Sequence, residues 1–144
     1  MSKFLSPTRR IQPYPMVADR HAIVVKPRLA FWEWVNDSNM HNLVIRPKGD
    51  EGRVYLVPSG RAAAGWINKH WHKVLETELA VWTRDTDLWP DLTRKQFDAW
   101  FTVEDHLVTY DTGTKGLRKM HYPPTVVGPN SVEHRKKMPV IDVP

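Results

Sequence analysis

Apolar positions follow a helical period through the middle of the chain, between residues 66 and 101. At 100° per residue they gather on one broad face, while charged and polar side chains fall opposite or on the flanks. This pattern predicts a long helix that begins after the N-cap residue Ser59 and ends near Arg84. Its apolar face consists of Trp71, Val74, Leu75, Leu79, Val81 and Trp82.

A second, shorter helix is predicted after Trp89, which precedes Pro90 and is therefore restricted to extended conformations. Its start carries a capping box, in which the Thr93 hydroxyl and the Gln96 side chain satisfy backbone donors reciprocally. The aromatic residues that follow have the i, i+3, i+4 spacing of a buried stripe: Phe97, Trp100 and Phe101. We interpret the tryptophans of this region as core, with a ligand groove as the alternative.

The flanking segments have the composition of strands. Residues 20–26 form a buried strand by this criterion, residues 42–46 and 53–57 an antiparallel hairpin, and residues 103–110 a last strand. Residues 28–36 fit either a strand or a helix, and we favour a short helix because a run of Asn, Asp and Ser stops it. This order predicts an α+β fold, a two-layer sandwich whose small, mostly antiparallel sheet is covered on one face by helices.

Patterning is lost on both sides of residues 20–111, which we take as the domain. Residues 1–19 are predicted to be an extended, proline-broken arm, and residues 112–144 a basic tail rich in Pro and Gly. The net charge of +5 resides largely in the tail, since residues 1–111 hold 15 of the 21 basic and 14 of the 16 acidic side chains. Nucleic-acid binding would therefore depend on two tail clusters, Lys115, Arg118 and Lys119, and Arg135, Lys136 and Lys137.

Several classes of chemistry find no support in the residues. Zero cysteine excludes disulfides and thiol catalysis, and there is no membrane-length apolar run or secretory signal, which predicts a cytoplasmic protein. His70 and His72 point about 200° apart on a helix, which disfavours a metal site. Asp85, Asp87 and Asp91 are expected to act as caps or ion-pair partners rather than as cation ligands. No cofactor and no metal are expected.

Glu78 interrupts the apolar face of the long helix. A carboxylate at such a position must be paired, hydrogen-bonded or protonated, and Arg94 and His106 are the candidate partners. It either clamps the structure or serves as an acid or base with a raised pKa, in which case Arg94 or His106 would assist it. We favour the clamp, because no second catalytic group is placed beside it by spacing. The turn residues Asp85 and Trp89, together with Arg94, are candidate binding residues.

A set of short motifs is similar to those of a group of small bacterial proteins of unknown function. The resemblance covers about residues 20 to 111, and neither the arm nor the tail. It implies a cytosolic bacterial protein and a helix at 28–36, but no activity, cofactor or catalytic residue. The motifs are Lys26-Pro27, Phe31-x-x-Trp34, Val54-Tyr55-Leu56-Val57-Pro58, Glu76-x-Glu78-Leu79-x-x-Trp82-x-x-Asp85, Leu88-Trp89-Pro90, Phe97-x-x-Trp100-Phe101 and a closing strand that ends in Asp111.

These observations leave three functions open. High aromatic content without a catalytic constellation favours a non-enzymatic domain that binds another protein. The charge asymmetry allows a nucleic-acid-associated protein that binds through its tail. The third alternative is an enzyme that uses Glu78 as its acid or base. No membrane partner is expected, and the sequence leaves the oligomeric state open.

Overall fold

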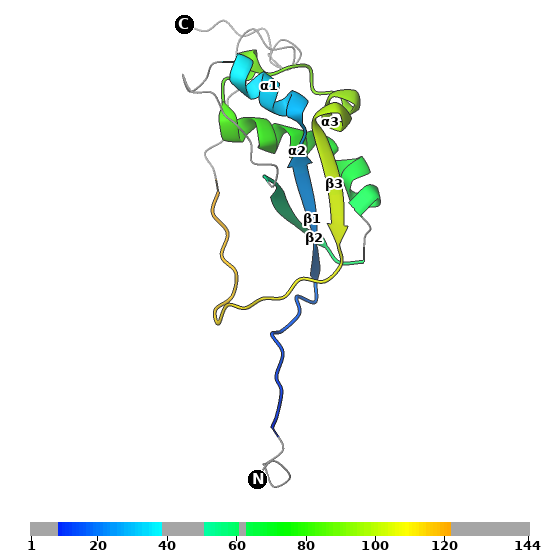
Figure 1. Ribbon diagram of the computed structural model, residues 1–144, viewed down its shortest axis with the longest axis vertical. Helices are drawn as coiled ribbons and strands as arrows, with labels where there is room; N and C mark the ends of the chain where they lie inside the picture. Colours follow the sequence, from blue (N-terminus) through cyan, green and yellow to red (C-terminus); the bar gives the residue numbers. More distant parts are fainter. Residues whose placement is uncertain (1–8, 39–50, 61–62, 122–144) are drawn as a thin grey trace, which may run out of the picture.

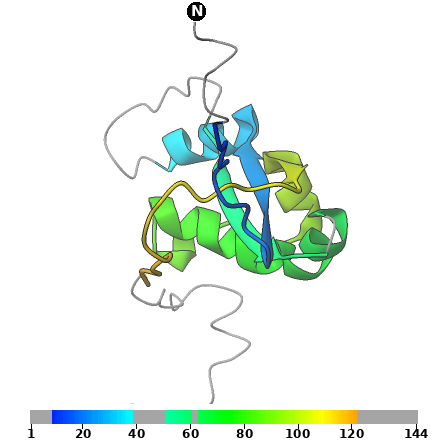
Figure 2. The same cartoon turned by 90° about the horizontal axis from the view of Figure 1, so that it is seen from below.

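The computed structural model describes residues 9–38, 51–60 and 63–121. These residues form a three-stranded antiparallel sheet in the order β2-β1-β3, with helices packed on one face (Figure 1). Seen from below, α2 lies along one side of the sheet (Figure 2). This is the α+β fold that the sequence predicts. The elements in chain order are β1 (Arg20–Pro27), α1 (Leu29–Asp37), β2 (Arg53–Pro58), α2 (Ala63–Trp82), the 3-10 turn η2 (Thr86–Leu88), α3 (Arg94–Trp100) and β3 (Phe101–His106).

The core lies between the sheet and the helices. Ile23 and Val25 of the central strand and Val57 of β2 are fully buried, and Leu75 and Leu79 of α2 meet them from the helical layer. Burial of one face of each strand follows from the period of two, which sends alternate side chains to the same side of a sheet. β1 is therefore the buried strand that the sequence predicts at residues 20–26.

An aromatic cluster closes one end of this core around Phe31 of α1. The Phe31 ring lies 5.6 Å from Trp32, 5.5 Å from Trp100 and 4.9 Å from Phe101, measured between ring centroids. Edge-to-face and offset pairs at such distances add to the free energy gained by burying the rings. The cluster joins α1, α3 and β3, and it confirms the helix predicted at 28–36 and the inward stripe of α3.

The last strand begins earlier than predicted. β3 starts at Phe101, directly after α3, because Phe101 is extended (φ −136°, ψ 147°) and its buried ring continues the aromatic stripe into the sheet. It ends at His106, and residues 107–110 leave the ladder with β1. Further on, the Val17 N–H donates to the Thr109 carbonyl (2.7 Å) and the Asp111 N–H to the Pro15 carbonyl (2.9 Å). Residues 15–17 thus pair with residues 109–111, and we call these segments together with their flanking residues 11–14 and 107–108 the ribbon.

Two other predictions need correction or lie beyond the described residues. β2 pairs with β1, with Tyr55 opposite Ile23, and residues 42–46 of the predicted hairpin lie outside the described residues. α2 begins at Ala63, not directly after Ser59, because Gly60 takes a left-handed conformation (φ 80°) that turns the chain. The Asp105 carboxylate accepts a hydrogen bond from the Ala63 N–H (3.2 Å). At the end of the helix, Val81 is exposed, although the sequence predicted it on the apolar face.

The start of α3 gives a direct test of the capping sequence. The Thr93 hydroxyl accepts a hydrogen bond from the Gln96 N–H (3.1 Å). Thr93→Ala should lower the free energy of unfolding by about 1 kcal/mol, because that donor loses its partner. Urea unfolding followed by tryptophan fluorescence measures the change. Thr114→Ala, at an exposed position outside the helices and strands, is the control; equal effects of the two substitutions would contradict the cap.

Candidate functional site

Glu78 is buried on α2, with 2% of its surface exposed, and it is held by two side chains of β2. The Arg53 Nε–H donates to one carboxylate oxygen (3.0 Å), and the Tyr55 hydroxyl donates to the other (2.5 Å). Both donors sit on the inner face of the edge strand, where the alternation of residues 53–57 places them. The prediction of a buried and paired Glu78 is confirmed, and the pair locks β2 to α2.

The partners predicted for Glu78 were wrong. Arg94 instead donates to the Asp98 carboxylate, one turn along α3 (2.9 Å), and to the side-chain amide oxygen of Asn68 (2.9 Å). His106 lies on the exposed side of β3 and contacts Glu104 at 3.3 Å. Spacing along the chain did not reveal Arg53 and Tyr55, but the strand pattern held the signal, because it sends Arg53, Tyr55 and Val57 to one face.

Burial dominates the electrostatics of this cluster. Desolvation raises the pKa of Glu78 above its ordinary value of 4.5, and the hydrogen bond from Tyr55 and the charge of Arg53 oppose that rise. Burial and the neighbouring carboxylate likewise raise the pKa of Tyr55. A carboxylate enclosed by its own donors has its lone pairs occupied, which fits a clamp better than a group that exchanges protons with a substrate.

The candidate binding residues of the turn make local contacts. The Asp85 carboxylate accepts a hydrogen bond from the Asp87 N–H (3.1 Å) and caps η2, as predicted. The Trp89 indole N–H donates to the Thr83 carbonyl (3.0 Å), and its ring packs against the core. Asp85 and Trp89 both bond to Thr83 and thus hold the turn itself, whereas Arg94 binds residues of α3 and α2. Within the described ranges, no three His, Asp or Glu side chains gather as a metal site would require.

The basic clusters of the tail fall on both sides of the described boundary. Lys115, Arg118 and Lys119 are exposed, in a segment without helix or strand. Arg135, Lys136 and Lys137 lie outside the described residues. No helix among the described residues is long and apolar enough to cross a membrane.

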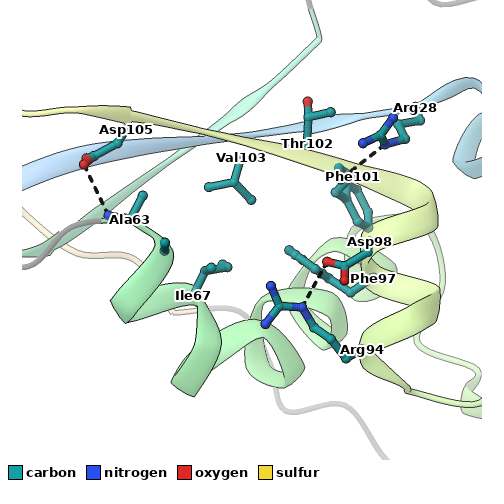
Figure 3. Close-up of a pocket in the computed structure, with 11 residues that line it drawn as sticks. Arg28, Ala63, Ile67, Arg94, Phe97, Asp98, Phe101, Thr102, Val103 and Asp105 are labelled. Atoms are coloured by element: carbon teal, nitrogen blue, oxygen red, sulfur yellow. Dashed lines mark hydrogen bonds and ion pairs between the residues drawn. The ribbon is translucent and has the colours of Figure 1, made fainter.

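A groove lies between β3, the first turns of α2, and α3 (Figure 3). Its volume is ≈ 650 Å³. Apolar side chains of all three elements line it, and charged side chains mark its rim, with Arg28 near one end and Asp105 near the other. The sequence analysis did not identify this groove, because residues that are far apart in the chain form it.

The face of the sheet opposite the helices is apolar along β2 and the adjoining part of β1. No helix among the described residues covers it, and Val54 and Leu56 of β2 expose 62% and 44% of their surface. In the register of the strands, Val24 lies beside Val54 and Ala22 beside Leu56, so the four form one strip, in which Val54 and Leu56 are exposed and Ala22 is buried. The chain enters β2 close to this strip, since a Cβ on Gly52 would come within 2.9 Å of the Val24 side chain. We call these four residues the open strip.

The ribbon extends beyond the body of the domain (Figure 1), and it carries further exposed apolar side chains. Met16 pairs with Tyr110, and both are more than half exposed. Two-stranded ribbons are only marginally stable in water on their own. Large apolar side chains that stay exposed on such a ribbon contribute little to its stability. Further apolar side chains of the ribbon are likewise exposed: Ile11, Tyr14, Leu107 and Val108.

Comparisons with protein-family models, with curated proteins and with solved structures return no match. Any assignment of function therefore depends on the geometry of this chain. The geometry offers a buried, hydrogen-bonded carboxylate, a groove with a charged rim, an apolar strip on the sheet, and a ribbon with exposed apolar side chains.

The pH dependence of stability tests the role of Glu78. Because its folded-state pKa is raised, its contribution to stability is complete below pH 4.5 and is lost as pH rises through the folded-state pKa. Glu78→Gln should abolish this fall in the free energy of unfolding. Tyr55→Phe should steepen it, because it removes a donor that favours the carboxylate, and should cost about 1–2 kcal/mol.

Chemical denaturation between pH 4.5 and 8 measures these profiles. Glu76→Gln, two residues away on the same helix and less buried, is the matched control. Glu104 does not overlap this window: hydrogen bonds from Lys26 and then His106 lower its pKa, so its contribution is lost only as pH falls below 4.5. A wild-type stability that stays level above pH 4.5 would contradict the assignment.

Proposed function

We propose that this protein is a non-enzymatic binding domain that docks on another protein through the open strip and the ribbon. The observation that carries the proposal is the exposure of large apolar side chains on both, from Val54 at 62% to Leu107 at 72%. An antiparallel sheet with one solvated face ordinarily places polar side chains on that face. Contiguous exposed apolar surface of this kind is typical of protein interaction sites.

The charges beside the open strip indicate what kind of partner fits. On the same face, Lys26 forms an ion pair with Glu104 (2.9 Å), and Glu104 also contacts His106 (3.3 Å). These charges are neutralised within the face, so it presents no uniform field of one sign. A nucleic acid or an anionic membrane would need such a field, whereas an apolar and weakly charged protein surface would not.

The described geometry also supports a function without catalysis. Glu78 is the buried acidic group of the core, and Arg53 and Tyr55 occupy its two oxygens. The lack of cysteine supports a reducing compartment, and we infer that the protein acts in the bacterial cytoplasm.

Photo-crosslinking in the full chain tests the docking surface. A photoreactive residue placed at Leu56 or at Tyr110 should give the same discrete crosslinked species, while one at Lys95, on the exposed side of α3, should not. Mass spectrometry identifies the species, and a second copy of this chain is one of its outcomes. Val54→Lys should weaken binding of that purified partner by about tenfold or more, because it places a charge in the contact. Different species from Leu56 and Tyr110, or equal yields from Lys95, would contradict the proposal.

Nucleic-acid binding through the tail is the alternative, and it has a separate test. Six phosphate contacts would make the logarithm of the affinity for duplex DNA fall with the logarithm of salt concentration at a slope of about −5. Replacing the six basic tail residues by Gln in the full chain should abolish any such binding. Titration of duplex DNA at several salt concentrations measures it, and unchanged binding by the variant would exclude the tail.

A further inference from the structure

The outer edge of β3 borders the groove and has no paired strand among the described residues. The sheet order β2-β1-β3 places β1 on one side of β3 and leaves the other side open. An unpaired edge presents backbone N–H and C=O groups that can form a ladder with another chain. Phe101, Val103 and Asp105 turn toward α2 and α3 and line the groove (Figure 3).

Small residues at the start of α2 make room beside this edge. Ala63 and Ala64 line the groove, and a Cβ on Gly65 would meet no atom within 4 Å. Ile67 and Phe97 form its apolar floor and are themselves nearly buried. The space between β3 and α2 therefore accepts side chains of modest size, placed alternately along an extended chain.

The charged residues of the rim differ in whether they already have partners within the domain. Arg94 already binds Asp98 and Asn68. The Asp105 carboxylate accepts from the Ala63 N–H, and its other oxygen lies 3.2 Å from the buried His21 ring. Arg28 differs from both.

Arg28 lies at one end of the groove. Its backbone N–H donates to the Trp100 carbonyl (2.6 Å), and its side-chain Nε–H donates to the Phe101 carbonyl (3.4 Å). These bonds hold the residue at the start of β3. In the part of the chain that the structure describes, no acidic side chain forms an ion pair with its exposed guanidinium. The groove is thus positively charged at the Arg28 end, whereas the Asp105 carboxylate near the other end is already hydrogen-bonded within the domain.

We propose that the groove binds an extended peptide segment of a partner protein by strand addition to β3. The segment carries small apolar side chains at alternate positions, over Ala64 and Val103, and an acidic side chain at Arg28. Backbone hydrogen bonds to the strand edge provide the affinity, and the guanidinium selects the acid, since it can bind a carboxylate through two parallel bonds. A helical ligand would leave the edge of β3 unpaired, which disfavours it.

Peptide titration tests the proposal with the full chain. The probes are two capped peptides of alternating valine and serine, one with glutamate at the amino-terminal end and one with glutamate at the carboxyl-terminal end. One of them should bind, and it thereby decides whether the added strand runs parallel or antiparallel to β3. Its matched peptide with glutamine should bind about tenfold more weakly, because it loses a charge-assisted pair. Amide hydrogen exchange should slow at alternate residues of β3 when the peptide is bound.

Two substitutions separate the charge from the groove. Arg28→Glu should weaken binding of the glutamate peptide by more than tenfold. This variant should instead bind the peptide in which lysine replaces the glutamate. Ala64→Trp, at an exposed position, should block the groove for both peptides. Leu56→Lys, on the opposite face of the sheet, should leave peptide binding unchanged, which distinguishes this site from the open strip.

Circular dichroism confirms that each variant is folded. No binding of either glutamate peptide at about 1 mM would overturn the proposal, since strand addition with an ion pair should be detectable there. Equal binding by the wild type and Ala64→Trp would overturn the location, and failure of the lysine peptide to bind Arg28→Glu would overturn the role of Arg28.

Discussion

Burial of Phe31 is the contact on which the arrangement of this domain depends. Its ring meets Trp100 and Phe101, which end α3 and begin β3, while the Arg28 N–H three residues earlier donates to the Trp100 carbonyl (2.6 Å). Loss of a buried ring of this size typically costs about 3–5 kcal/mol. Because α3 passes into β3 without a loop, the same contact sets the position of the edge strand. It thereby brings Arg28, which lies between β1 and α1, to the end of the groove.

Each edge strand is tied to α2 by a polar contact. Glu78 holds Arg53 and Tyr55 of β2, and Asp105 of β3 accepts from the first N–H of the helix. The two ties differ in electrostatic character. Glu78 is desolvated and its pKa is raised, so that tie is strained by the burial of a charge, while Asp105 acts at a helix N-terminus, where negative charge is favoured. Among the described residues the three-stranded sheet has two unpaired edges, and these contacts fix both edge strands without pairing either edge.

Local periodicity predicted the elements better than their partners. The i, i+3, i+4 spacing of Phe97, Trp100 and Phe101 predicted burial correctly, and the Thr93 cap followed from sequence neighbours. The partner of Glu78 could not be predicted in this way, because Arg53 is 25 residues away in the chain and contacts Glu78 only when β2 pairs with β1. The start of β3 was also missed, because Phe101 both ends the helical stripe of α3 and begins the strand. Its helical spacing of 3.6 residues hid the alternation of two residues that marks a strand. The groove depends on contacts among β3, α2 and α3 and had no local signal, although the small residues Ala63 and Ala64 line it.

Both proposed surfaces exist because the described helices and strands leave one face and one edge of the sheet uncovered. The helices of the described residues cover a single face of the sheet, so the other face stays exposed, and no further strand covers β3 among these residues. A monomer could accommodate the open face with polar side chains and the edge with a bulge, a proline or an inward-pointing charge. On the open face, Val54 and Leu56 are apolar instead, and the charges beside them are neutralised by one another. At the edge, Arg28 has no acidic partner among the described residues and stands at one end, while Asp105 near the other end is already engaged by the Ala63 N–H. The apolar face favours an apolar protein surface as its partner. The unpaired edge, with Arg28 at one end, favours an extended peptide bound in one direction, so we assign the two surfaces different ligands.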